Sequence, residues 1–220
     1  MSNTYILKYA RDDRVKYVSH LDFVRLFQRA TRRAGIEFQY SQGFNPHPIM
    51  TVARPLSVGV TAEEEYLKVG FEGEPQNIME RLNEALPDGY KITYVHKLLE
   101  KEIDVNLIDT ADYEVLVELV SGEQLQSDAI DKILAQKDLT VPKKTKSGVK
   151  DENIREHIYS LAILEQDGNM AKIAMSVTCD AVYNLKPETV LDAISKYANK
   201  HIAYYTVNRK KLYIRKGDKS

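Results

Sequence analysis

Residues 19–35, SHLDFVRLFQRATRRAG, have the pattern of an amphipathic helix with a defined start and end. Ser19 is a typical N-cap residue with Asp22 three residues later, and Gly35 can adopt the left-handed conformation that ends a helix. Because successive helical residues are turned by about 100°, apolar and basic side chains separate onto opposite faces. The apolar face holds Phe23, Leu26, Phe27, Ala30 and Ala34, and the basic face holds Arg25, Arg29, Arg32 and Arg33. The stretch therefore predicts a helix whose apolar face packs on a sheet.

Strand patterns surround this helix in an order that predicts the fold of the first half. Residues 5–9 (YILKY) favour a strand before it, and residues 49–58 and 65–71 favour two strands after it. A second helix is expected at 75–86, and a closing strand at 90–98. The order β, α, β, β, α, β is that of a ferredoxin-like (split βαβ) domain with an antiparallel sheet.

The second half repeats this architecture loosely. The elements expected there are a strand at 112–120, a helix at 124–136, a short strand at 139–141, a hairpin of 157–165 and 170–179, a helix at 187–198 and a strand at 204–214. We therefore expect an α+β chain of two tandem ferredoxin-like halves, residues 1–98 and 112–220, joined by an acidic linker at 99–111.

The composition excludes several classes of protein. The 220 residues carry 31 Lys and Arg against 32 Asp and Glu, an ordinary balance for a soluble chain. No apolar run reaches the roughly 18 residues of a membrane span and the N-terminus lacks a signal-peptide pattern, so we expect a cytoplasmic protein. The single cysteine, Cys179, excludes an internal disulfide and a cysteine-based metal cluster. The histidines show no metal-binding spacing and Gly-rich phosphate motifs are absent, so we expect no metal or cofactor in this chain.

The charge is unevenly distributed along the chain. Residues 1–62 carry nine Lys and Arg against four Asp and Glu, residues 63–140 carry seven against nineteen, and residues 141–220 carry fifteen against nine. Two basic segments that flank an acidic one could form an anion-binding face, or they could interleave into a mixed surface.

Two basic clusters are candidates for phosphate contacts. Arginine presents planar donors that suit phosphate, and lysine-rich loops contact phosphates without sequence preference. The expected nucleic-acid contacts are Arg25, Arg29, Arg32 and Arg33 of the helix, Arg54 of the following strand, and Lys143, Lys144, Lys146 and Lys150 of the loop PKKTKSGVK at 142–150. The alternatives are ion pairs between the arginines and the acidic segment, and a lysine loop that is only solvated.

The segment YSQGFNPHP at 40–48 is the strongest local motif. Its glycine permits a positive φ, and its two prolines fix a stiff, extended path. Such a rigid loop could hold a ligand or a partner with Gln42, Asn45 and His47. The alternative is a turn between strands in which Phe44 and the prolines cover the edge of the sheet.

Several motifs together resemble a known family. They are KYVSHLD at 16–22, RRAGI at 32–36, YSQGFNPHP at 40–48, RPLSVGV at 54–60 and TKSGVKDENIREHI at 145–158. With them the chain resembles the bacterial radical-SAM-linked (radical-SAM-associated) proteins, a family of unknown function. The resemblance implies a partnership with a radical-SAM protein, because the chain itself lacks the three-cysteine motif that binds the radical-SAM cluster.

Three functions are open at this point. The first is a noncatalytic accessory module that binds structured RNA and acts with a radical-SAM enzyme. The second is a protein–protein adaptor for such an enzyme, without nucleic acid. The third is an RNA-processing enzyme that uses His20 or His47 as an acid or base. We favour the first, because the one-sided arginine helix directly precedes the rigid polar loop.

Overall fold

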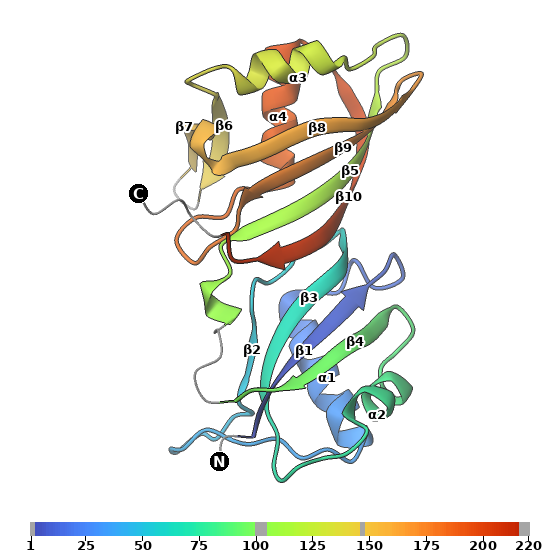
Figure 1. Cartoon of the computed structure of the whole chain (residues 1–220), viewed down its shortest axis with the longest axis vertical. Helices are drawn as coiled ribbons and strands as arrows, with labels where there is room; N and C mark the ends of the chain where they lie inside the picture. The colour runs from blue at the N-terminus through green and yellow to red at the C-terminus, as the bar shows by residue number, and fades with distance from the viewer. Residues whose placement is uncertain (1–2, 100–104, 146–147, 216–220) are drawn as a thin grey trace. The chain divides into compact units, whose positions relative to one another are not determined.

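The structure, a computed structural model, describes residues 3–99, 105–145 and 148–215. The chain divides into two units, residues 1–108 and residues 109–220 (Figure 1). Each unit combines helices with an antiparallel sheet, so the expected α+β class is confirmed. None of the described helices is both long and apolar enough to cross a membrane.

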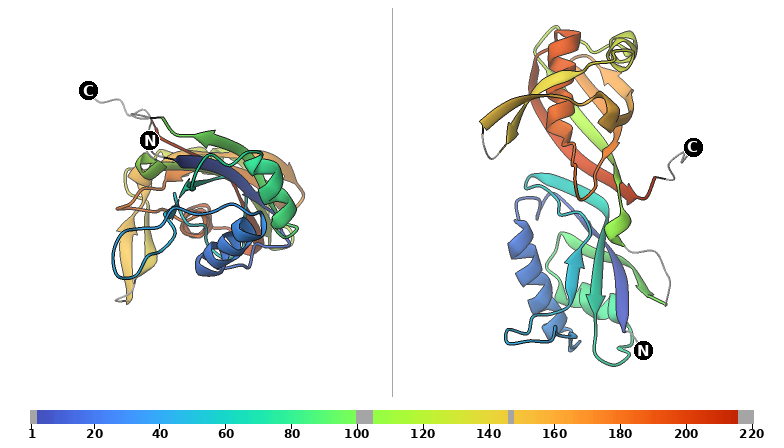
Figure 2. Two further views of the ribbon diagram at one scale, coloured as in Figure 1. Left: turned by 90° about the horizontal axis from the view of Figure 1, so that it is seen from below. Right: turned by 90° about the vertical axis from the view of Figure 1, so that its left-hand side faces the viewer.

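In the first unit, two helices cover one face of an antiparallel sheet. The elements are β1 (Thr4–Arg11), α1 (His20–Arg33), β2 (Met50–Val52), β3 (Val60–Gly70), α2 (Ile78–Ala85), β4 (Tyr90–Lys97) and a 3₁₀ turn at Val105–Leu107. Within this unit the strand order is β4-β1-β3-β2, and each neighbouring pair is antiparallel. Figures 1 and 2 show α1 and α2 on the same face of the sheet. The basic face of α1 is therefore turned away from the strands.

The core of this unit follows from the alternation of its strands and the period of α1. Leu7 of β1 lies opposite Leu67 of β3, and both are fully buried on the helix side of the sheet. Phe23 and Phe27 of α1 are also buried, and the ring of Phe23 stacks on Tyr9 with 4.8 Å between centroids. Burying each such side chain contributes about 1.5–3 kcal/mol. This packing fixes the rotation of α1 about its axis.

Both ends of α1 agree with the sequence prediction. The backbone N–H of Asp22 donates to Oγ of Ser19 over 3.2 Å, so Ser19 is the N-cap. Gly35 follows the C-cap residue Ala34 and has a φ of +66°. A glycine is favoured there because other residues are strained in this region.

The second unit also has two helices beside an antiparallel sheet. Its elements are β5 (Thr110–Leu119), α3 (Ser127–Leu134), β6 (Thr140–Thr145), β7 (Gly148–Asn153), a 3₁₀ turn at Arg155–His157, β8 (Ile158–Asp167), β9 (Met170–Thr178), α4 (Pro187–Ala198) and β10 (Ile202–Tyr213). Within this unit the strand order is β10-β5-β9-β8. Cys179 is buried next to β9. The first residue of β5 is Thr110, which the sequence pattern placed in the linker at 99–111.

The lysine-rich segment differs from its prediction as a loop. Residues 140–145 and 148–153 form β6 and β7, a separate antiparallel hairpin, and residues 146–147 lie outside the described residues. Val141 is fully buried and anchors the start of the hairpin. Thr140, Val141, Thr145 and Val149 are β-branched, and this propensity, together with the anchor, outweighs the loop signal of the lysines.

The strand expected at 49–58 is also shorter than predicted. Only Met50–Val52 pair with β3, as the strand β2. Pro55 lacks a backbone N–H, so the segment cannot continue as a regular strand in the ladder.

Candidate nucleic-acid interface

Three arginines of α1 line a hollow in the surface of the first unit. Arg25, Arg29 and Arg33 follow one another at intervals of four residues, so they share one side of the helix. The hollow has a volume of about 370 Å³. Its other lining residues are Val18, Asp22, Leu26 and Pro87. We call this feature the arginine hollow.

The arginine hollow keeps an excess of positive charge. Arg25 lies 3.4 Å from the carboxylate of Asp22, an exposed pair one turn apart. Arg33 donates to the carbonyl of Ala85 at the end of α2 over 2.6 Å. Arg29 has no ion-pair or hydrogen-bond partner in the described part of the chain. Three guanidinium groups against one carboxylate leave a formal charge of about +2.

The fourth arginine of the helix lies outside the hollow. Arg32 is exposed on α1, and no hydrogen bond or ion pair engages its side chain within residues 3–99, 105–145 and 148–215. None of the four arginines pairs with a carboxylate of residues 63–140 in the described structure. Within the described residues, the acidic segment therefore does not neutralise the basic face of α1 in the way that the alternative interpretation required.

Arg54, which we expected to contact phosphate, binds the backbone of its own unit. Its Nε and Nη2 donate to the carbonyl of Ile108 over 3.0 and 2.6 Å, and Nη2 also donates to the carbonyl of Asn106 over 2.8 Å. Its Nη1 donates to the carbonyl of Ala53 over 3.1 Å. Because its donors bind these carbonyls, Arg54 stabilises the end of the first unit, and we do not include it in the nucleic-acid interface.

The motif at 40–48 forms a loop that is closed by its own hydrogen bonds. Ser41 N donates to the carbonyl of His47 over 2.9 Å, and His47 N donates to Oγ of Ser41 over 3.1 Å. Oγ of Ser41 also lies 2.9 Å from Nδ1 of His47. Gly43 has a φ of +126°, as the motif predicts. The loop therefore has a defined conformation that its own hydrogen bonds stabilise, and Gln42, Asn45 and His47 are all exposed on it.

Phe44 does not cover the edge of the sheet, as the alternative interpretation of this motif required. Its side chain is fully exposed at the tip of the loop. None of the residues 40–48 lines the arginine hollow.

The predicted lysines belong to the second unit. Lys143 and Lys144 lie on β6, Lys150 is exposed on β7, and Lys146 is outside the described residues. At the level of Cα positions, Lys143 pairs with Lys150 across the hairpin. The lysines therefore sit on a hairpin of the second unit, and the arginine hollow belongs to the first.

The two candidate acid–base histidines lie in different surroundings. His20 is the first residue of α1, and His47 is held in the closed loop by Ser41. In the described ranges, no three side chains of His, Cys, Asp or Glu are grouped so that they could hold a metal ion.

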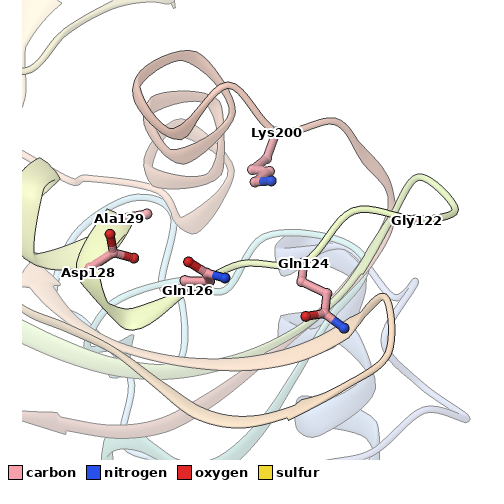
Figure 3. A pocket seen from close by; sticks show the side chains of 6 residues that line it. All are labelled: Gly122, Gln124, Gln126, Asp128, Ala129 and Lys200. Atoms are coloured by element: carbon pink, nitrogen blue, oxygen red, sulfur yellow. The ribbon is translucent and has the colours of Figure 1, made fainter.

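Sequence reasoning missed a second hollow, which lies in the second unit (Figure 3). Its volume is about 380 Å³, and it is lined by Gly122, Gln124, Gln126, Asp128, Ala129 and Lys200. Asp128 forms an ion pair of 2.9 Å with Lys132 on the next turn of α3. No local motif indicates this hollow, because Lys200 follows α4 while its other residues surround the start of α3.

A polar cluster in the second unit was also missed. The ring of Tyr183 stacks on His157 with 3.6 Å between centroids, and Nδ1 of His157 lies 3.2 Å from Oγ1 of Thr178. Thr178 donates in turn to the hydroxyl of Tyr159 over 2.8 Å. Burial raises the pKa of the Tyr183 hydroxyl, and the neighbouring Glu152 raises it further. These residues are separated in sequence, so no spacing rule could have grouped them.

Comparison with known proteins supplies a family and a fold. A family model described as "Uncharacterized protein conserved in bacteria (DUF2344)" matches residues 4–187. A comparison with curated proteins finds no match.

Solved structures of similar fold include three complexes. A crystal structure of a Cbf5–Nop10–Gar1 complex matches with 10% identity and a TM-score of 0.53, over 94% of this chain and 48% of that one. An H/ACA RNP bound to a substrate RNA containing 2'-deoxyuridine matches with 10% identity and a TM-score of 0.48, over 93% and 47%. An archaeal box H/ACA sRNP Nop10–Cbf5 complex matches with 13% identity and a TM-score of 0.42, over 84% and 42%. The chain thus spans about half the length of these three chains, and at 10% identity the likeness to the first of them concerns the fold alone.

Proposed function

The chain belongs to this uncharacterised bacterial family, and on that premise we propose that it is an accessory protein that binds structured RNA. The observation that carries the proposal is the arginine hollow, which is lined by Arg25, Arg29 and Arg33 and by a single carboxylate. Arg29 is the central cation of this row and has no partner in the described part of the chain. An anionic ligand would supply the missing counter-charge.

The spacing of the three arginines favours a polyanion over a single phosphate. Four helical residues advance about 6 Å along the axis, so the guanidinium groups form a row. A row of cations can contact successive phosphates of one nucleic-acid strand, whereas a single phosphate would use only part of it. The lysines of the β6–β7 hairpin, Lys143, Lys144, Lys146 and Lys150, remain part of the proposal as contacts of the second unit with the same kind of ligand.

We interpret both units as ferredoxin-like halves in tandem, as the order of elements in the sequence predicts. The support is that each unit has its fourth, first, third and second main strands side by side in that order: β4-β1-β3-β2 in the first and β10-β5-β9-β8 in the second. In the second unit, the β6–β7 hairpin would then be an insertion between the first helix and the second main strand.

The proposal includes a radical-SAM enzyme as the partner. This part rests on the motif residues alone, above all YSQGFNPHP at 40–48. The likeness to an RNA-bound complex lends no support to the RNA proposal, because its TM-score of 0.48 is too low to carry a functional argument.

The test is a pair of charge reversals on neighbouring turns of α1. Arg29→Glu places a carboxylate in the centre of the arginine hollow, and Arg32→Glu makes the same change of charge outside it. We expect the parent protein to retain RNA in a filter assay at low salt. Arg29→Glu should lose most of this retention, and Arg32→Glu should lose clearly less.

Two results would refute the proposal. Equal losses in both variants would indicate a general charge effect without a site. Absence of RNA binding by the parent, at any salt concentration, would favour the second candidate function, a protein–protein adaptor. In that case the fully exposed Phe44 would be the candidate anchor of the protein interface, because aromatic side chains are enriched in such interfaces.

A further inference from the structure

The loop between α1 and β2 (Figure 1) carries Phe44, whose ring is fully exposed. We propose that Phe44 stacks on an unpaired nucleobase, while the amides of Gln42 and Asn45 contact the edge of that base. This inference rests on the proposed function and deepens it, because it names the part of the RNA that the loop recognises. It assigns a binding role to a residue for which the motif indicated only a structural one.

The loop holds the ring in place before any ligand arrives. The three Ser41–His47 contacts close its base, and the isolated bridge between Tyr40 and Pro48 continues the pairing below them. Pro46 restricts the backbone directly after Asn45. A base that stacks on Phe44 therefore does not have to order a flexible loop, which would otherwise reduce the affinity.

The surroundings of the ring fit a base better than a phosphate. Residues 41–48 contain no Lys, Arg, Asp or Glu. The side-chain amides of Gln42 and Asn45 are exposed and have no partner among the residues that the structure describes. Each amide offers a carbonyl acceptor and an NH₂ donor, the groups that pair with the Watson–Crick edge of a base. The loop would thus read a base, while α1 holds the backbone of the RNA.

The same surroundings fit a base better than a protein partner. The side chains next to the ring are polar or absent: Gln42, Gly43 and Asn45. The anchor of a protein interface is usually surrounded by further apolar contacts that exclude water. Gly43 and Asn45, which flank Phe44 directly, offer no such contacts, and Pro46 is the nearest apolar residue along the chain. Stacking on a base requires only the face of the ring, and is tolerant of a polar, wet environment.

The absence of tryptophan from the chain allows a direct experiment. Phe44→Trp introduces the only tryptophan of the protein, at the tip of the loop. We expect its fluorescence to be quenched when single-stranded poly(A) is added, because the indole then stacks on adenine. A fully paired RNA duplex should quench it far less, since its bases are not available for stacking.

A matched control comes from the second unit. Val182 is almost fully exposed on a loop, so Val182→Trp gives an exposed single tryptophan that is not part of the motif. Its fluorescence should not respond to poly(A). In the filter assay, Phe44→Ala should weaken poly(A) binding about 10-fold, and Phe44→Tyr should restore most of it.

The outcomes separate this inference from the function on which it rests. If RNA, structured or single-stranded, is retained in an Arg29-dependent way but poly(A) does not quench Phe44→Trp, the inference is wrong and the arginine hollow stands. Quenching of both tryptophans alike would also overturn it, because the effect would be nonspecific. If no RNA binds at all, the proposed function is refuted together with the inference. Quenching of Phe44→Trp by a radical-SAM protein instead would assign the loop to a protein interface.

Discussion

Replacing Arg29 by Gln removes the central cation from the arginine hollow and keeps a long polar side chain in its place. Arg29 is exposed and has no partner in the described part of the chain, so the substitution breaks no contact of α1. Gln is also a good helix former. The variant should therefore unfold like the parent, and its RNA affinity should change through charge alone.

The size of the effect follows from the number of phosphate contacts. Each contact with a single strand contributes about −0.7 to the slope of log K against the logarithm of the salt concentration. Three arginines predict a slope of about −2, which is a roughly 20-fold loss of affinity when the salt concentration rises fourfold. Arg29→Gln leaves two contacts and predicts a slope of about −1.4, a roughly 7-fold loss over the same range.

The assay is fluorescence anisotropy of labelled single-stranded poly(A), titrated with protein at several salt concentrations. Further cations elsewhere on the protein would steepen both slopes, so the difference between variants is the quantity to compare. Arg32→Gln is the matched control, since it removes a cation of α1 outside the hollow and should leave the slope close to that of the parent. Parallel lines for Arg29→Gln and the parent would show that Arg29 contacts no phosphate.

Three further predictions concern stability. Arg54→Ala should lower the free energy of unfolding in urea by about 1–3 kcal/mol, because it removes the bonds to the Ile108 carbonyl, and should leave the salt dependence of RNA binding unchanged; a changed slope with normal stability would restore Arg54 to the interface. Arg81→Ala should also lower the free energy of unfolding by about 1–3 kcal/mol, because its guanidinium donates to two carbonyls at the end of α1 over 2.9 and 3.0 Å. A urea midpoint equal to that of the parent would contradict this. Hydrogen bonds from His201 lower the pKa of the Glu123 carboxyl, so Glu123→Gln should lower Tm at neutral pH. The difference in Tm between the variant and the parent should vanish as the pH falls through that lowered pKa. A difference in Tm that persists in acid would exclude this cause.

The features that sequence predicted well depend on neighbours along the chain. Ser19, Gly35 and the apolar spacing of Phe23 and Phe27 define α1 by themselves, because capping and periodicity act within a few residues. The same is true of Gly43, whose positive φ the turn requires. The candidate residues of α1 were therefore placed correctly on one exposed face.

The features that sequence predicted poorly depend on partners far away in the chain. Arg54 lies in a basic segment as Arg29 does, yet its donors bind the carbonyl of Ile108. The lysine segment looked like a loop, yet the burial of Val141 anchors it as a hairpin. Charge and composition alone could not separate these cases, since the decisive contacts are tertiary.

The sequence by itself determined the helix, its row of arginines and the stiff loop after it, because backbone propensity and periodicity are local properties. The tertiary structure decided which of these charges remain available. Packing places Pro87 beside α1, which completes the arginine hollow. It also brings Arg54 within hydrogen-bond distance of the Ile108 carbonyl and leaves the ring of Phe44 exposed. The physical reason is that hydrogen-bond partners and burial are set by contacts between distant segments, and these contacts determine whether a cation or a ring can meet a ligand.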